Sequence, residues 1–395
     1  MLTKWTAIAE PEGRGGAAPL LRRVVVGIAV LAGTLGLAAC GSEGGGLEGG
    51  SSSDAEVQTA EGGDPSGELT ISNWPLYIDK QTVPNFEQET GVETKYIEDI
   101  NDNTEFFGKL RPQLAQGESG GRSIIMPTDW MAAKMYDLGY ILNLDKSAIP
   151  NVEENLIPSL QSPSFDPERD FSVPWQSGMT GIIVRKDLAP DVTSINDLFD
   201  PKYEGKVTFL SEMRDSVPLV MKANGVDPTE ATDQDWLDAI DQISEAASSG
   251  QIRDFTGNDY ADDLTRGDVV AAVGWSGDAI QLQADNPNIE WRMPDEGCML
   301  WTDNMLIPVG APNTAAALAF MDYVYDPEVA ADITEYVQYV SPVAGVKEIL
   351  VDRDPKIANN QLIFPDEEFT ADCTIQVSPE DEQTVTEAFE SVLSG

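Results

Sequence analysis

The strongest constraint on the fold is the alternation of short β-like runs and helical stretches that begins at Glu68 and continues toward the C-terminus. The β-like runs are apolar and rich in β-branched residues, and helical stretches separate most of them. This pattern predicts an α/β fold with largely parallel sheets, because a helix is the usual connection between parallel strands. The expected strands are Glu68–Asn73, Glu93–Glu98, Ser123–Met126, Gly181–Arg185, Lys206–Leu210, Val269–Trp275 and Asn304–Pro308.

The length of this alternating region favours two lobes over a single sheet, because single hydrophobic cores stop growing at a few hundred residues. Ligands of open α/β sheets bind beyond the carboxyl ends of the strands. Aromatic and acidic side chains collect at those ends, as in the sequence Trp275-Ser276-Gly277-Asp278 after one expected strand. The sequence therefore predicts a ligand site beyond the carboxyl ends of these strands.

The N-terminus has the pattern of a targeting segment. Arg22 and Arg23 precede an apolar run, Val24 to Ala39, that is shorter than the roughly 20 residues a membrane-spanning helix needs. The run ends in Leu37-Ala38-Ala39-Cys40, which resembles a bacterial lipobox. This resemblance implies that residues 1–39 are a signal peptide and that Cys40 carries a lipid; an ordinary signal peptide with an incidental cysteine is the alternative.

The segment that follows Cys40 is rich in glycine, serine and acidic residues up to Gly67, so residues 40–67 are expected to be a lipidated cysteine and a flexible tether. Two further cysteines, Cys298 and Cys373, lie in the folded part. In an exported protein such a pair suggests a disulfide, with two buried thiols as the alternative.

Charge and composition exclude several classes of function. The formal net charge is −44, and a surface this acidic repels nucleic acid. The chain contains no histidine, which excludes Ser-His-Asp and Cys-His catalysis and zinc sites built on histidine. The segment from Gly117 to Gly121 matches the Gly-x-Ser-x-Gly pattern of hydrolases, but without a histidine we interpret it as a loop. Our expectation is a binding protein and not an enzyme, with no cofactor and no metal, although the missing histidine does not by itself exclude enzymes or metal sites that use carboxylates.

The residues at the strand ends fit one ligand chemistry. A linear polyamine needs carboxylates for its ammonium groups and flat apolar walls for its methylene chain. The loops that follow the expected strands supply both kinds of residue: Trp74 and Tyr77, Asp129 and Trp130, Glu212 and Asp215, Trp275 and Asp278, and Trp301 and Asp303.

Several of these loops also carry the local sequences of a known family. The chain resembles the spermidine/putrescine-binding proteins of bacterial ABC importers from Glu68 to about Ala344. The matching segments are Ser72 to Ile78 (SNWPLYI), Asn85 to Gly91 (NFEQETG), Met126 to Trp130 (MPTDW), Phe171 to Trp175 (FSVPW), Gly274 to Asp278 (GWSGD) and Trp301 to Pro308 (WTDNMLIP).

This resemblance implies a two-lobed periplasmic-binding-protein fold of type II, with a hinge and a cleft between the lobes. The lobes are expected at residues 68–177 plus 303–345 and at residues 178–302 plus 346–395. The implied function is capture of a polyamine, putrescine or spermidine, and its delivery to the permease subunits of an ABC transporter. The protein is expected to be an exported monomer, held on the outer face of the cytoplasmic membrane by its lipid only.

The resemblance carries individual residues to the ligand site, and Asp129 is added as an extra acid beside them. A glutamine that family members have near the C-terminus has no clear counterpart, because the alignment ends near Gly345. The expected ligand-binding residues are Trp74, Tyr77, Thr128, Asp129, Trp130, Glu212, Asp215, Trp275, Asp278, Trp301, Asp303 and Tyr339.

Four other interpretations remain open, and one of them is a ligand-sensing or adhesive lipoprotein that does not take part in transport. Carboxylates also bind hard metal ions such as calcium, although a metal does not need aromatic walls. An aromatic cleft also suits another organic cation, such as a quaternary ammonium compound. A secreted glycosidase would use a pair of carboxylates with tryptophan stacked on the sugar.

Overall fold

The computed structural model describes residues 58–395. Cys40, the expected signal peptide and most of the expected tether lie outside the described residues. Within the described part, every helix is too short or too polar to cross a membrane.

The first sheet is parallel and has the order β3 (Glu93–Glu98), β2 (Glu68–Asn73), β4 (Ile124–Ile125). All residues of β2 except the first are buried, as expected for a central strand covered on both faces. The carboxyl ends of these parallel strands meet at one edge, so the segments that follow β2 and β4 start close together.

The second sheet is mixed. Its order is β12 (Thr374–Ile375), β11 (Met299–Met305), β6 (Val173–Arg185), β9 (Ala271–Trp275), β7 (Val207–Leu210), β8 (Ile252–Thr256), and β10 (Ile289–Arg292) pairs with β6. The expectation of largely parallel sheets is wrong here, because β6 runs antiparallel to β9, β10 and β11. The pairs β7–β8, β7–β9 and β11–β12 are parallel.

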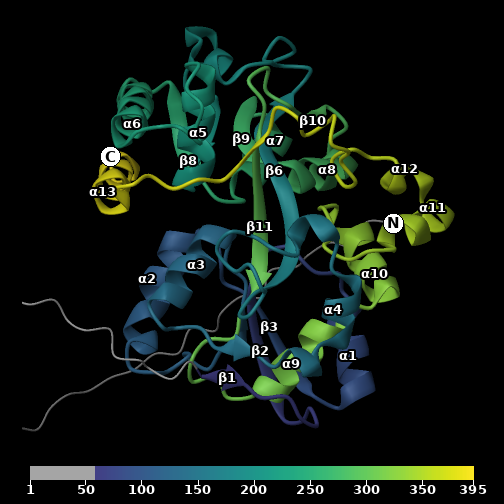
Figure 1. Ribbon diagram of the computed structural model, residues 1–395. Coiled ribbons are helices and arrows are strands. Elements are labelled where there is room, and N and C mark those ends of the chain that lie inside the picture. The colour runs from purple at the N-terminus through teal and green to yellow at the C-terminus, as the bar shows by residue number, and fades with distance from the viewer. Residues whose placement is uncertain (1–57) are drawn as a thin grey trace, which may run out of the picture. The chain divides into compact units, whose positions relative to one another are not determined.

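Strands β6 and β11 explain this mixture, because they run side by side between the two halves of the molecule (Figure 1). One carries the chain away from the first sheet and the other brings it back, so they must be antiparallel. At the end of β11 the pairing continues to the first sheet, where Thr128 forms a bridge with Asp303 and Ile125 forms one with Leu306.

A third sheet of the described residues has two parallel strands, β1 (Thr59–Ala60) and β5 (Asn143–Leu144). Helices cover the two larger sheets, and local signals mark several of their ends. Thr232 and Asp235 form a capping box at the start of α6, and glycines with positive φ, Gly91 and Gly267, end α1 and α7. The helices are α1 (Thr82–Thr90), α2 (Asn103–Leu114), α3 (Asp129–Asp137), α4 (Pro150–Asn155), α5 (Met213–Ala223), α6 (Asp233–Ser248), α7 (Tyr260–Arg266), α8 (Ser276–Asp285), α9 (Thr314–Tyr323), α10 (Pro327–Val337), α11 (Val346–Arg353), α12 (Pro355–Ala358) and α13 (Glu382–Leu393).

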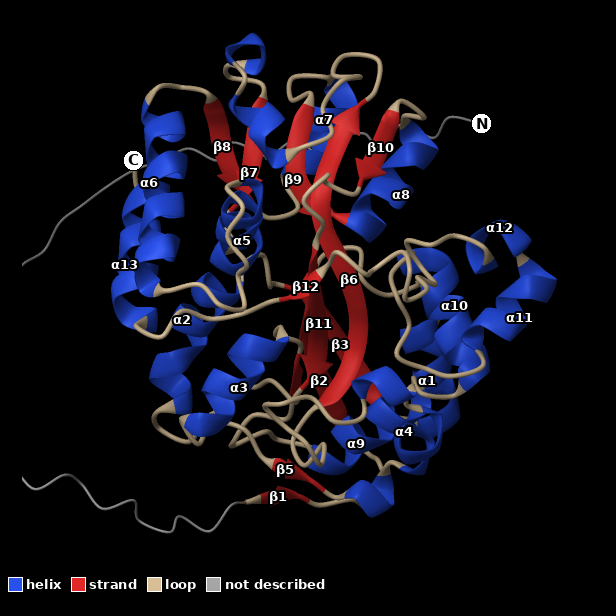
Figure 2. Ribbon diagram, turned by 45° about the horizontal axis from the view of Figure 1, so that its top comes forward, coloured by secondary structure: helices blue, strands red, loops and turns tan. Residues whose placement is uncertain are grey.

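The C-terminal segment returns to the second sheet after α12. Helix α11 packs against α10 before the chain reaches α12. Cys298 and Cys373 form a disulfide, which attaches the segment next to β11. The chain then ends in α13, which lies beside α6 (Figure 2).

Candidate functional site

A cavity lies where the strand ends of the first sheet face those of the second. The space between its lining residues is about 410 Å³, part of which is open to solvent. The first sheet contributes the segment after β2 and the start of α3, and the second contributes the starts of α5 and α8. Ten of the twelve predicted residues line it: Trp74, Tyr77, Thr128, Glu212, Asp215, Trp275, Asp278, Trp301, Asp303 and Tyr339.

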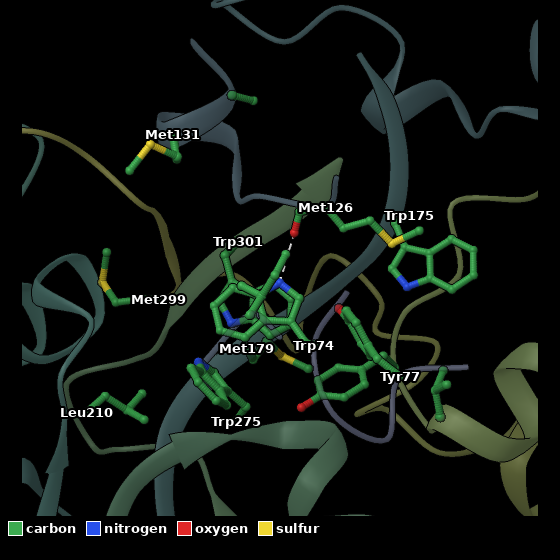
Figure 3. Packing of buried hydrophobic residues seen from close by; sticks show 14 of the residues in the cluster. Trp74, Tyr77, Met126, Met131, Trp175, Met179, Leu210, Trp275, Met299 and Trp301 are labelled. Carbon is green, nitrogen blue, oxygen red and sulfur yellow. Dashed lines mark hydrogen bonds between the residues drawn. The ribbon is translucent and has the colours of Figure 1, made fainter. Parts of the chain in front are cut away.

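Five aromatic rings form the apolar wall of this cavity. Trp74 lies edge-on to Trp275, with ring centroids 6.0 Å apart, and Trp275 lies edge-on to Trp301 at 6.5 Å. Tyr339 continues the row, 5.5 Å from Trp301 and 5.1 Å from Tyr77. Figure 3 shows Trp74, Trp275, Trp301 and Tyr77 gathered around one point, with Trp74 Nε1 donating to the carbonyl oxygen of Met126. Such rings can face both a methylene chain and a cation.

Asp303 is the most strongly perturbed aspartate of the site. It lies on β11, is 4% exposed, and accepts hydrogen bonds from the hydroxyls of Thr128 (2.8 Å) and Tyr77 (3.1 Å). Burial raises the pKa of Asp303 to about 8, against these two hydrogen bonds, and the charges of Asp129 and Asp215 raise it further. An empty site therefore holds this carboxyl group largely protonated at neutral pH.

Asp215 lies in the first turn of α5 and anchors three donors. Its carboxylate accepts from Thr180 Oγ1 (2.8 Å), Gln376 Nε2 (2.7 Å) and Trp275 Nε1 (3.1 Å). Burial raises the pKa of Asp215 to about 6, because desolvation outweighs the stabilising hydrogen bonds. The indole of Trp275 is thus oriented by the same carboxylate that lines the cavity.

Asp278 lies in the first turn of α8, three residues after Trp275. It accepts hydrogen bonds from the hydroxyls of Tyr260 and Tyr339 and from Asn258 Nδ2, each at 2.7 Å. Burial raises the pKa of Asp278 above its ordinary value. Because Tyr339 follows α10, this carboxylate connects α8 to the segment after α10.

Glu212 directly precedes α5 and reaches across to the first sheet. It accepts from the backbone nitrogen of Asn103 (2.6 Å) and from Asn103 Nδ2 (2.9 Å). Burial raises the pKa of Glu212 well above its usual value, and the charge of Asp102 adds to the effect. Asn103 Nδ2 also donates to the hydroxyl of Thr128, which donates to Asp303, so a single chain of hydrogen bonds links two of the acids.

The described residues that line the cavity include four carboxyl groups and no lysine or arginine. Buried carboxylates are normally paired with a cation, since an isolated buried charge is costly. Here the donors are neutral hydroxyls, amides and an indole. The site as built is therefore electrostatically incomplete, and a bound cation would complete it. Residues 58–395 contain no cluster of three acidic or cysteine side chains arranged to hold a metal ion.

The structure does not bring two predicted residues, Asp129 and Trp130, into this cavity. Both belong to the first turn of α3, which turns them away from Thr128 toward a neighbouring groove. The Asp129 carboxylate accepts from Asn304 Nδ2 at 2.6 Å, and the ring of Trp130 lies 3.6 Å from the guanidinium carbon of Arg214.

The cavity also contains four residues that the sequence did not identify: Pro75, Asn103, Asn258 and Gln376. Gln376 was missed because the alignment ended near Gly345. The expected disulfide held a usable signal, because Gln376 follows Cys373 by three residues and Cys298 directly precedes β11. Asn103 and Asn258 carried no signal, because asparagine near a helix start is usually a cap.

The fold and sequence match known solute-binding proteins. The profile of the family described as bacterial extracellular solute-binding protein matches residues 81–365. The putrescine-binding periplasmic protein PotF of Escherichia coli (strain K12) is 30% identical over 350 residues, which are 83% of this chain and 91% of that protein. The spermidine/putrescine-binding periplasmic protein of the same organism is 27% identical over 77% of this chain and 85% of its own length.

A solved structure agrees. The spermidine/putrescine ABC transporter substrate-binding protein PotD from Streptococcus pneumoniae superposes with a TM-score of 0.67 at 26% identity, over 82% of this chain and 98% of that one. The predicted two-lobed, type II periplasmic-binding-protein fold is confirmed. Proteins of this kind bind and transport solutes and are not enzymes, which confirms that expectation and removes the glycosidase reading. The chain belongs to the bacterial extracellular solute-binding protein family.

Proposed function

We propose that this protein captures a small polyamine, such as putrescine or spermidine, outside the cytoplasm and delivers it to an ABC importer. The observation that carries this proposal is the set of four carboxyl groups, three of them buried and that of Asp278 partly buried, with no basic side chain among the described lining residues. A cation with several N–H groups supplies both the missing charge and the missing donors.

The walls of the cavity favour an organic cation over a bare metal ion. Rings of Trp74, Trp275 and Trp301 offer apolar surface that a metal ion cannot use. A polyamine alternates charged nitrogens with methylene groups, so it can contact carboxylates and rings at once. The related proteins that carry polyamine names support the same choice.

Capture would proceed by closure of two lobes around the ligand, at the expected limits of residues 68–177 plus 303–345 and residues 178–302 plus 346–395. Support comes from β6 and β11, which run between the two halves of the molecule, and from the hydrogen bond of Asn103 to Glu212 across the cavity. In the open form the acids would face water. Binding of a cation removes their mutual repulsion and so favours closure.

Delivery and anchoring complete the proposal. A lipid on Cys40 would hold a monomer at the outer face of the cytoplasmic membrane, and the tether would let it reach the permease subunits. The sequence pattern around Cys40 supports the anchor, and the similarity to an ABC transporter substrate-binding protein of known structure supports the partner.

Calorimetric titration of the purified protein with putrescine, spermidine, spermine and calcium tests the ligand class. We expect tight binding of at least one polyamine and none of calcium. Asp215→Asn should weaken polyamine binding on the order of 100-fold, because it removes a buried charge partner. Asp241→Asn, which removes the same charge from an exposed position on α6, is the matched control and should bind as the unchanged protein does. Absence of heat with every polyamine would reject the proposal.

A further inference from the structure

Asn258 lies in the loop between β8 and α7 and has one side-chain atom without a partner. Its Nδ2 donates to Asp278 Oδ2 at 2.7 Å, and its Oδ1 is buried with no hydrogen-bond partner among the described residues. The residue lines the ligand cavity. A buried acceptor left unpaired costs free energy, so its presence in a binding cavity points to a donor on the ligand.

The hydrogen bonds of the loop determine which way the amide points. Asp278 Oδ2 accepts the hydroxyl of Tyr260 as well as the amide of Asn258. A carboxylate oxygen in that position only accepts, so the NH₂ group of Asn258 must face it and the carbonyl oxygen must face away. The acceptor in the cavity is therefore a consequence of the surrounding contacts.

The carboxylate of Asp278 has too few free acceptor positions to bind all the N–H donors of a primary ammonium. Its two oxygens offer about four lone-pair positions, and Asn258, Tyr260 and Tyr339 occupy three of them. The two tyrosine oxygens themselves receive backbone N–H groups, from Trp275 and from Asp278. A primary ammonium has three N–H donors, so Asp278 alone cannot satisfy it.

We propose that Asn258 is a specificity-determining residue, whose Oδ1 accepts an N–H from the ammonium group that binds Asp278. The inference rests on the proposed function and deepens it. The affinity of the site would then depend on the number of N–H donors on the ligand nitrogen as well as on the charge of that nitrogen. It would select a primary ammonium over a methylated one of equal charge, which excludes the quaternary ammonium reading left open by the sequence.

A second carboxylate in the cavity shows the same arrangement. Gln376 Nε2 donates to Asp215 Oδ1 at 2.7 Å, and Gln376 Oε1 is buried without a partner in the described part of the chain. Asp215 also receives three donors in total. At both Asp278 and Asp215, a side-chain amide donates its nitrogen to the carboxylate and leaves its oxygen without a partner in the described residues. This repeated arrangement supports the interpretation of Asn258 as an acceptor for the ligand.

The test is a titration of the full protein with putrescine and with its mono-, di- and trimethylated derivatives at one nitrogen, together with butylamine. In the unchanged protein, affinity should fall stepwise as N–H donors are replaced by methyl groups. Asn258→Ala should weaken putrescine binding at least about tenfold and should weaken the trimethylated ligand at most about twofold. The methylation series should consequently be flatter in the variant.

Controls separate the possible failures. Asn224→Ala changes an exposed asparagine of the same half of the molecule and should leave the whole series unchanged. The melting temperatures of the unchanged protein and of Asn258→Ala, both without ligand, show whether the variant folds. If the unchanged protein binds no polyamine, the proposed function fails. If it binds polyamines but Asn258→Ala weakens every ligand by one common factor, or none, the residue does not read N–H donors and this inference is overturned.

Discussion

Two neighbouring regions of the molecule use the same residue types in opposite ways. In the cavity, Trp275 and Trp301 stand beside Asp215 and Asp303, and no described lining residue is basic. At the start of α3, Trp130 and Asp129 have internal cations instead. The guanidinium of Arg214 covers the Trp130 ring. Burial raises the pKa of Asp129 to about 6, and the hydrogen bond from Asn304 and the charge of Arg169 oppose this rise.

Arg214 shows which partners surround a cation that is part of the protein chain itself. Arg214 Nε donates to Ser378 Oγ at 2.9 Å, and its Nη2 lies 3.1 Å from Glu382 Oε1. An aromatic face and a carboxylate together hold the guanidinium. The cavity offers the same two elements without an internal cation, and this difference supports the proposal that the cavity binds a cationic ligand.

The largest expected difference between the two regions is the loss of polyamine affinity when a carboxylate is replaced by an amide. Asp303→Asn should weaken polyamine binding on the order of 100-fold, because a charge-assisted hydrogen bond contributes about 1.5–3 kcal/mol and its loss leaves an ammonium unpaired. Asp129→Asn should change affinity by less than about threefold, because its carboxylate is turned toward Asn304. Calorimetry measures both.

The same variants should move stability in a way that distinguishes a site effect from misfolding. Asp303→Asn removes a buried acid that has no cationic partner, so the empty protein should melt at a higher temperature at about pH 8. A lower melting temperature together with lost binding would mean that Asp303 supports the fold and not the site.

The tryptophans should differ by a smaller factor. Trp275→Ala removes a ring from the cavity wall and should weaken binding about 10- to 100-fold, since apolar and cation–π contacts are lost together. Trp130→Ala exposes Arg214 and should lower the free energy of unfolding by about 1–3 kcal/mol with little direct effect on the ligand. Calorimetric titration measures the affinity of both variants, and denaturant unfolding measures their stability. Equal losses of affinity in the two variants would contradict the assignment of Trp275 to the cavity and Trp130 to internal packing.

The pH dependence should separate the cavity acids from ordinary surface acids. The pKa of Asp303 is raised from 3.8 to about 8, so between these values the folded empty protein holds more protons than the unfolded chain. Its contribution to stability is present at low pH and is lost as pH rises through the folded pKa.

A bound cation lowers that pKa, so binding should release protons near neutral pH. Affinity should rise from about pH 6 to about pH 8, and the melting temperatures of the empty and bound forms should move apart over that range. Titration in two buffers with different heats of ionisation counts the protons released. Affinity independent of pH would show that the acids are already ionised in the empty protein.

The smallest expected effect concerns the partly exposed ion pair next to Arg214. Lys134 Nζ lies 2.8 Å from Glu382 Oε1, which connects α3 to α13. Lys134→Ala should change affinity by no more than about threefold, with the difference disappearing at high salt, because partly exposed pairs contribute about 0–1 kcal/mol. A large effect at high salt would show that this pair controls closure.

The strand ends of the site were readable in the sequence because each lies next to an apolar run. Strands β2 and β3 have the bounds that the sequence predicts. The sequence missed β8, β10, β12 and the first half of β6, which are short or pass from one sheet to the other. The expected strand Asn304–Pro308 overlaps β11 only at Asn304 and Met305, because pairing with β6 places β11 at Met299–Met305.

The sequence by itself determined the α/β fold, the class of protein and ten residues of the cavity, because hydrophobic period, strand ends and local motifs are all short-range properties. Only the tertiary structure decided that Asp129 and Trp130 turn away while Asn103, Asn258 and Gln376 turn in. The direction of a side chain at a helix start, and a contact between segments far apart in the chain, depend on how the two sheets and the disulfide-linked C-terminal segment pack. No local pattern encodes that packing, which is why the acceptors that complete the site appeared only in three dimensions.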